Sequence, residues 1–409
     1  MKDWTELGFR GLPSTSARER LTVEPPMIQP VLAAARASLA EPLVGVSTDG
    51  RVHRGLYALR ATGVPTRPII EAAQAFLAAL DAAQRARVVL DTEAVERRMW
   101  FNIHPNVFRH GLILDGLSQR QRDAAMELMR RTLSARGFEQ ARDIMRLNGL
   151  LVEVTGRAAD YGEWPYFVSL FGAPSADAPW GWQIDGHHLC LNFFVLGDQL
   201  VCTPSFMGSE PCSVARGPLA GTSVFGLEAR VGLDLIRSLD AAQCRTAVLC
   251  ESISPEALPP ELKHPIDGRM QGAAFKDNAV IPYAGLRGDQ LSDVQRRLLL
   301  ELIRTYVGWA REDHAAVKMS EVEAHLNETH FAWMGATGDE GPFYYRTHSP
   351  VVLIEFDHHP GIVFDNLEPS RHHIHTIIRT PNGGDYGADL LRQHHERFDH
   401  SHGRHVARR

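Results

Sequence analysis

The sequence lacks both a long hydrophobic run and a strong excess of charge of either sign. It nowhere contains the roughly 20 consecutive apolar residues that a membrane-spanning helix needs, and its N-terminal stretch has no apolar segment typical of a secretory signal. The 43 basic and 49 acidic residues give a formal net charge of −6, which offers no basic footprint for nucleic acid. We therefore expect a small-molecule substrate as the partner, and neither a membrane nor a nucleic acid.

Cysteine is also scarce, and several familiar motifs are missing. The five cysteines form no C-x-x-C pair, and an odd number without a framework is typical of free thiols in a reducing compartment. This pattern predicts a cytoplasmic protein. The sequence contains no P-loop, G-x-G-x-x-G, G-x-S-x-G or H-E-x-x-H motif, so nothing supports a nucleotide-binding protein, a serine hydrolase or a zincin protease.

One local pattern, L-[D/S]-x-x-Q, occurs four times, beginning at Leu80, Leu117, Leu239 and Leu291. Asp or Ser followed three residues later by Gln is a capping box, because the two side chains satisfy backbone N–H groups reciprocally at a helix start. The pattern predicts helix starts near residues 81, 118, 240 and 292. The repeated "LDAAQ" indicates either an internal duplication or independent use of the same cap, and the second is the simpler interpretation.

The remaining segments predict a mixed fold. Helical spacing occurs at 28–39, 68–89, 118–137, 139–153, 229–250, 292–312 and 318–330, and short β-type runs at 166–171, 189–195, 200–203, 351–356 and 374–380. The Pro- and Gly-rich stretch 254–289 resembles a binding loop or lid. We predict one large α+β domain over residues 30–393, with helices packed around a largely antiparallel sheet. An N-terminal arm (1–29) and a His-rich polar tail (394–409) flank it.

A predicted hairpin places His188 among polar residues. Gly197-Asp198 suits a two-residue turn between two β-type runs. Because strand side chains alternate between faces, His188 and Asn192 then share a mixed face, while His187 lies at the end of the apolar face. The mixed face is either a polar pocket, with His188 as an acid/base or ligand, or a solvent face.

The C-terminal third offers the strongest candidate for a metal site. His373 and His375 form an H-x-H pair in a predicted strand, so their imidazoles lie about 7 Å apart along one face. Glu355 and Asp357 share a face of the preceding predicted strand. His373, His375 and Glu355 would bind a divalent metal, zinc first and iron second, with His188 or Asp357 as general base. Alternatively, the histidines simply face water.

Other residues are candidates to contact a substrate. Tyr344 and Arg346 in "GPFYYRTHSP" could line the pocket, and Arg346 or Arg379 could hold a carboxylate through two parallel hydrogen bonds. Trp333 could form an apolar wall. Core packing for Trp333 and a salt bridge for Arg346 are the competing interpretations.

Three of these segments carry a resemblance to a known family. "WGWQIDGHHLCLNFFVLGDQLVCTPSFMGSEP", "YYRTHSPVVLIEFD" and "HIHTIIRTPNGGDYGADLLRQH" resemble DUF3500, a domain of unknown function, and the resemblance extends from about residue 30. It implies no particular activity. It does imply that the G-H-H-L, E-F-D and H-I-H segments contribute to one site.

The sequence leads to three hypotheses. The first is a metal-dependent hydrolase of a small polar or anionic molecule, which uses a metal-activated water. The second is a non-haem Fe(II) oxygenase at the same site, since two histidines and one carboxylate are also its ligand set. The third is a small-ligand-binding protein without a metal.

Overall fold

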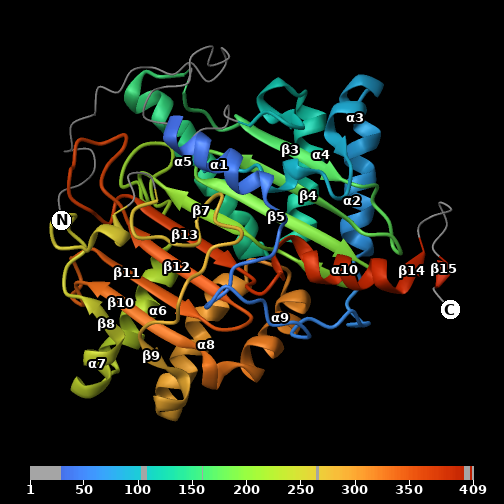
Figure 1. Cartoon of the computed structure of the whole chain (residues 1–409). Helices are drawn as coiled ribbons and strands as arrows, with labels where there is room; N and C mark the ends of the chain where they lie inside the picture. Colours follow the sequence, from blue (N-terminus) through green and yellow to red (C-terminus); the bar gives the residue numbers. More distant parts are fainter. Residues whose placement is uncertain (1–28, 103–107, 159, 264–266, 400–405, 408–409) are drawn as a thin grey trace.

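The computed structural model describes residues 29–102, 108–158, 160–263, 267–399 and 406–407. Within them, one sheet of thirteen strands runs in the order β1-β3-β4-β5-β7-β13-β12-β11-β10-β8, with β2, β6 and β9 paired beside this path (Figure 1). Only β1–β3 and β8–β10 are parallel. The strands are β1 (Val89–Leu90), β2 (Leu112–Ile113), β3 (Tyr166–Phe171), β4 (Trp180–Gly186), β5 (Leu189–Leu196), β6 (Gln199–Val201), β7 (Ser205–Ser209), β8 (Val248–Cys250), β9 (Leu286–Arg287), β10 (His330–Gly335), β11 (Phe343–His348), β12 (Leu353–His358) and β13 (Ile374–Arg379).

Ten α-helices accompany this sheet in the described part of the chain: α1 (Gln29–Ala40), α2 (Arg67–Ala79), α3 (Ala82–Val88), α4 (Gln119–Thr132), α5 (Ala135–Thr155), α6 (Gly226–Arg237), α7 (Ala241–Ala247), α8 (Asp293–Val307), α9 (Glu312–Ala324) and α10 (Ala388–Arg397). A separate pair, β14 (Phe398–Asp399) and β15 (Val406–Ala407), follows α10. None of the described helices combines the length and apolar character that a bilayer crossing requires. The predicted α+β class, with a mostly antiparallel sheet, is confirmed.

Two predicted boundaries fall differently from the structure. Helix α10 continues through His394 and His395, so the first residues of the predicted tail are helical. His400, His402 and His405 lie outside the described residues, and so does nearly all of the predicted N-terminal arm. The single helix predicted for 118–137 ends at Thr132. A Cβ on Gly137 would lie 2.3 Å from the carbonyl oxygen of Trp309. Gly137 therefore allows the first turn of α5 to approach that backbone closely.

All four predicted capping boxes are present. Asp81, Ser118, Asp240 and Ser292 each accept a hydrogen bond from the backbone N–H of the Gln three residues later. The same glutamines also meet in pairs, because Gln121 donates to Gln84, and Gln243 and Gln295 bond each other. The caps therefore join helix ends to one another as well as starting helices.

The elements repeat in the same order in the two halves of the chain. The series α2-α3-β1-β2-α4-α5-β3-β4-β5 is followed by α6-α7-β8-β9-α8-α9-β10-β11-β12. The pairing repeats as well, since β1 is parallel and β2 antiparallel to β3, while β8 is parallel and β9 antiparallel to β10. The sheet order is symmetric about the β7–β13 pair. The structure therefore favours an internal duplication as the origin of the "LDAAQ" echo.

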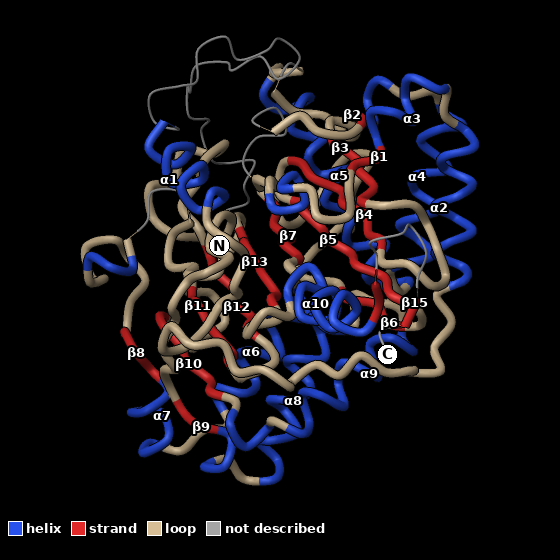
Figure 2. The backbone as a smooth tube through the Cα atoms, turned by 45° about the vertical axis from the view of Figure 1, so that its right-hand side comes forward, coloured by secondary structure: helices blue, strands red, loops and turns tan. Residues whose placement is uncertain are grey.

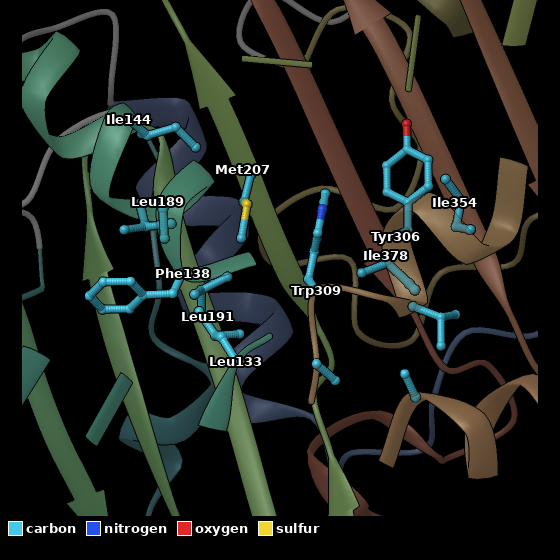
Figure 3. Packing of buried hydrophobic residues seen from close by; sticks show 14 of the residues in the cluster. Leu133, Phe138, Ile144, Leu189, Leu191, Met207, Tyr306, Trp309, Ile354 and Ile378 are labelled. Atoms are coloured by element: carbon cyan, nitrogen blue, oxygen red, sulfur yellow. The ribbon is translucent and has the colours of Figure 1, made fainter. Parts of the chain in front are cut away.

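The two faces of the sheet are covered differently. Helices α2, α4, α5, α6, α8 and α9 contribute to a large apolar cluster on one face, and Figure 3 shows part of this cluster. Helix α10 and long loops lie on the other face (Figure 2), where they contribute to smaller clusters. The predicted Gly197-Asp198 turn is confirmed, with Leu196 opposite Gln199. The register then slips by one residue before β7, because Leu191 lies opposite Ser205. Met207 therefore packs in the helix-side core, and Phe206 packs in a smaller cluster on the other face.

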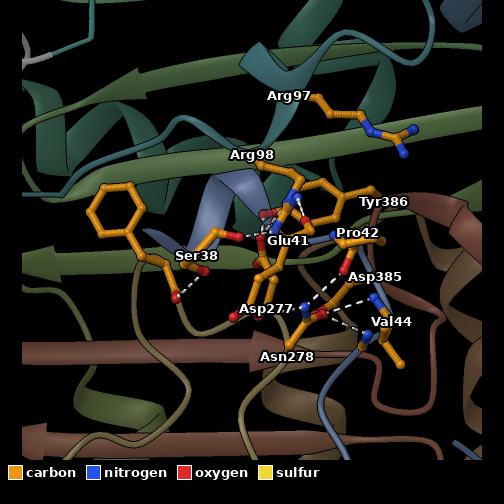
Figure 4. Close-up of polar contacts among 12 residues, drawn as sticks. Ser38, Glu41, Pro42, Val44, Arg97, Arg98, Asp277, Asn278, Asp385 and Tyr386 are labelled. Atoms are coloured by element: carbon orange, nitrogen blue, oxygen red, sulfur yellow. Dashed lines mark hydrogen bonds and ion pairs between the residues drawn. The ribbon is translucent and has the colours of Figure 1, made fainter. Parts of the chain in front are cut away.

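A buried chain of charges fastens the loop side of the sheet. Asp277, in the long connection between β8 and β9, pairs with Arg98 at 2.9 Å and with Arg379 on β13 at 3.0 Å. Arg379 also pairs with Asp385 at 2.9 Å, and Arg98 donates to backbone carbonyls at the end of α1 (Figure 4). The sequence prediction made Arg379 a substrate-binding residue. Instead, its remaining donors form hydrogen bonds with the carbonyls of Gly272 and Ala273. Its guanidinium therefore bonds other parts of the protein rather than a substrate.

Substitution of Arg379 tests this assignment. The Arg379→Ala change leaves two buried carboxylates without their common partner, so we expect the free energy of unfolding to fall by about 3–5 kcal/mol. The exposed Arg67, which pairs with Glu71 on α2, is the matched control, and Arg67→Ala should cost less than about 1 kcal/mol. Urea denaturation measures both. Equal losses in the two variants would contradict a structural role for Arg379.

Candidate metal centre

The candidate site lies where four neighbouring strands begin or end. His187 and His188 form the two-residue turn between β4 and β5, since Gly186 pairs with Leu189. His188 therefore has a left-handed backbone, with φ of +61°, and the prediction that it lies on the mixed face of a strand is wrong. Its N–H donates to the carbonyl of Asn102, and its carbonyl accepts from Gly208 on β7. These bonds direct the turn toward the start of β13.

Three imidazole nitrogens converge at this point. The Nε2 atom of His373 lies 3.2 Å from Nε2 of His188 and 2.9 Å from Nε2 of His375. The ligand atoms of the three residues all lie within 4.8 Å of one another. Metal–nitrogen bonds of about 2.0–2.1 Å in a tetrahedron separate two nitrogens by about 3.3 Å, close to the observed spacing. The three histidines could therefore hold a divalent metal ion.

The protonation of these rings suits a metal ligand. His373 Nδ1 lies 2.7 Å from the carbonyl oxygen of Pro360, to which it donates, so its Nε2 carries the lone pair. Burial, and secondarily the neighbouring histidines, hold the pKa values of His188 and His375 well below the usual range. Both rings are therefore neutral, as metal ligation requires.

Glu210 lies on the Nδ1 side of the His373 ring. Its Oε2 lies 3.6 Å from His373 Nδ1, and its carboxylate accepts hydrogen bonds from the amides of Ile362, Val363 and Phe364. The sequence prediction did not include Glu210. It lies directly after β7 in the "GSEP" segment, but no periodicity distinguishes it from an ordinary loop carboxylate.

His359 is a fourth histidine beside the three. Its ring centroid lies 4.0 Å from that of His375 and 5.3 Å from that of His373. Its Nε2 lies 2.9 Å from Oδ2 of Asp357. His359 is not among the site residues predicted from the sequence, although its position directly after the strand that carries Glu355 and Asp357 was a usable signal. Burial lowers its pKa to about 4, so the ring is neutral near pH 7.

Asp357 does not have the environment of a general base. Arg269 pairs with it at 2.6 Å, in addition to His359. Although burial opposes ionisation, Arg269 and His359 lower the pKa of Asp357 to about 2. Both of its carboxylate oxygens are already engaged, Oδ1 by Arg269 and Oδ2 by His359 and the Arg269 amide. The structure instead makes Asp357 the residue that orients His359.

Glu355 does not join the three histidines. It pairs across the sheet with Ile377 rather than with His375. Its carboxylate accepts hydrogen bonds from the amides of Gln271 and Gly272 and from the hydroxyl of Tyr344. These contacts correct the prediction of Glu355 as a metal ligand, and they place Tyr344 as its hydrogen-bond partner.

The other residues that were predicted to contact a substrate instead make contacts within the protein. Arg346 lies opposite Glu355 and donates to the side chain of Gln271 at 2.7 Å. Asn192 accepts from Gln183 and donates to the carbonyl of Pro204. Trp333 packs in the helix-side core and stacks on Phe343, so the core interpretation is the correct one. None of these contacts brings Arg346, Asn192 or Trp333 to the three histidines.

A comparison with known protein families covers the segments that form the candidate site. Residues 62–388 match the family described as "Protein of unknown function (DUF3500)". The chain therefore belongs to this family, which confirms the resemblance seen in the sequence. No curated protein and no solved structure matches the chain.

Gly208 provides a test of the observed geometry. A Cβ at this position would lie 2.9 Å from Cδ2 of His375 and 3.2 Å from Cδ2 of His188. Gly208→Ala should therefore push two ligands apart and weaken zinc binding about ten- to a hundredfold, as measured by isothermal titration calorimetry. Gly226→Ala is the control, since its Cβ would meet nothing within 4 Å. Unchanged affinity in Gly208→Ala would contradict the proposed convergence.

Proposed function

We propose that this protein is a metal-dependent hydrolase of a small molecule, with the ion bound by His188, His373 and His375. This proposal rests on the convergence of three buried Nε2 atoms. Three protein ligands leave one position of a tetrahedral ion open, which is the arrangement of catalytic rather than structural zinc sites. When bound there, a divalent ion lowers the pKa of water and polarises a carbonyl or phosphoryl oxygen.

The surrounding residues supply the remaining functions of a hydrolase. His359 is the group that accepts the proton lost by the attacking water, and it returns a proton to the leaving group. Asp357 orients His359 and stabilises its protonated form. Glu210 and the carbonyl of Pro360 fix the orientation of His373. The low exposure of His188, His373 and His375, at 5%, 1% and 4%, limits access of bulk water to the reacting atoms.

The ligand set favours zinc over the iron alternative. A non-haem Fe(II) oxygenase typically uses two histidines and one carboxylate. Among the described residues, the group within ligand distance consists of three histidines. The nearby carboxylates of Glu210 and Asp357 are held by backbone amides and by Arg269, respectively. Consumption of oxygen by the iron-loaded protein would nevertheless favour the oxygenase.

Elemental analysis tests the site directly. The parent is the untagged chain ending at Asp399, which removes His400, His402 and His405 but keeps α10. We expect about one zinc per chain, and loss of that zinc in the His373→Ala, His375→Ala double variant. The matched control is His53→Ala, His325→Ala, two histidines outside the site, which should retain the metal. Equal metal content in all three proteins would reject the site, and absence of metal from all three would favour a ligand-binding protein without a metal.

The role of His359 makes a separate prediction. We expect the zinc-loaded chain to hydrolyse members of a panel of p-nitrophenyl carboxylate and phosphate esters, and chelation to abolish the activity. Replacing His359 by Ala should lower kcat/KM about 10²–10⁴-fold while zinc content stays the same, because His359 is not a ligand. His325→Ala is the control. Hydrolysis that survives both chelation and His359→Ala would contradict the mechanism.

A further inference from the structure

A cavity lies on the face of the sheet opposite the three histidines. It lies between the sheet and helix α9 and has a volume of about 90 Å³. Its sheet wall includes Met207 on β7 and Ile378 on β13. These strands carry Phe206, Ile377 and His375 toward the other face, because side chains alternate along a strand. The cavity and the metal centre are therefore separated by the thickness of the sheet.

The interior of the cavity is mainly apolar. Leu133, Leu191 and Phe193 line it together with Met207 and Ile378, and all five belong to the helix-side core. Figure 3 shows Leu133, Leu191, Met207 and Ile378 around Trp309, which stands between the sheet and the helices. A ligand that fills this space must consequently be predominantly apolar.

Two polar groups in the lining lack a partner. Trp309 and His314 are 3% and 6% exposed, and both line the cavity. Within the described part of the chain, neither Trp309 Nε1 nor His314 Nε2 has a hydrogen-bond partner. Buried donors in native proteins are almost always satisfied, and an indole N–H can only donate. The missing partner of Trp309 must therefore be a hydrogen-bond acceptor.

The charges in the cavity lining oppose the binding of an anionic ligand. The described lining contains Asp198, Glu321 and Asp389 but one cation, Lys318, and Lys318 already pairs with Glu321 at 2.9 Å. No unpaired positive charge in this described lining would compensate a carboxylate or a phosphate. We propose that the cavity binds a neutral, mainly apolar small molecule whose carbonyl oxygen accepts a hydrogen bond from Trp309. This site is independent of the proposed hydrolase centre.

A fluorescent aromatic ketone tests the proposal. The probe is 6-propionyl-2-dimethylaminonaphthalene, which is neutral, carries one carbonyl and emits at shorter wavelength in apolar surroundings. We expect saturable binding of one probe per full-length chain, with a blue shift. The Ala315→Leu change fills the cavity from α9 and should weaken binding at least about tenfold, roughly the cost of excluding a well-fitted group. The exposed neighbour on the same helix, Ala316→Leu, should bind like the parent.

Two further variants distinguish binding in this cavity from binding elsewhere on the protein. Trp309→Phe keeps an aromatic ring but removes the donor, so it should weaken binding about three- to tenfold, and it decides the question if Ala315→Leu does not fold. The His373→Ala, His375→Ala variant should bind the probe unchanged. Absence of saturable binding, equal affinity in Ala315→Leu and Ala316→Leu, or unchanged affinity in Trp309→Phe would overturn the proposal. Loss of binding in the double histidine variant would do so too, since it would place the probe at the metal centre.

Discussion

The antiparallel pairing of β7 with β13 is the interaction on which the rest of the structure depends. It joins the strand that lies beside β5 of the first repeated series to the strand that lies beside β12 of the second, and so connects the two similar halves in a single sheet. The same pairing places Gly208 opposite His375 and lets the carbonyl of His188 accept from Gly208. The candidate metal centre therefore combines one histidine from the first half of the sheet with two from the second half, so neither half could form it alone.

Burial of charge is concentrated on the loop side of this sheet. Asp277 and Arg379 secure the long β8–β9 connection, whose Arg269 in turn pairs with Asp357. Each of these buried ions has a partner, as it must, because an isolated charge in the interior is costly. These ion pairs also affect the candidate metal centre. The pairing holds Asp357 ionised beside His359, while burial keeps His188 and His375 neutral.

The sequence predicted those features that depend on local chemistry. The capping boxes at Asp81 and Ser292 and the Gly197-Asp198 turn are set by neighbouring residues, and each was found as predicted. The H-x-H pair was also located correctly, because strand alternation is enough to bring His373 and His375 to one face. The family resemblance correctly indicated that the G-H-H-L and H-I-H segments meet.

What could not be predicted depends on contacts between distant segments. Strands β4, β10 and β11 were missed, since burial on both faces hides the alternation that identifies a strand. The predicted roles of Glu355 and Arg379 were wrong because both side chains form hydrogen bonds with a loop that lies roughly 80 to 110 positions away in sequence. His188 was placed on a strand face because nothing local revealed its left-handed turn.

X-ray absorption at the zinc edge of the loaded protein counts the imidazole nitrogens that bind the ion. We expect three of them at about 2.0–2.1 Å, and one fewer in His188→Ala. A carboxylate- or sulfur-dominated shell, or the same imidazole count in His188→Ala, would contradict this expectation.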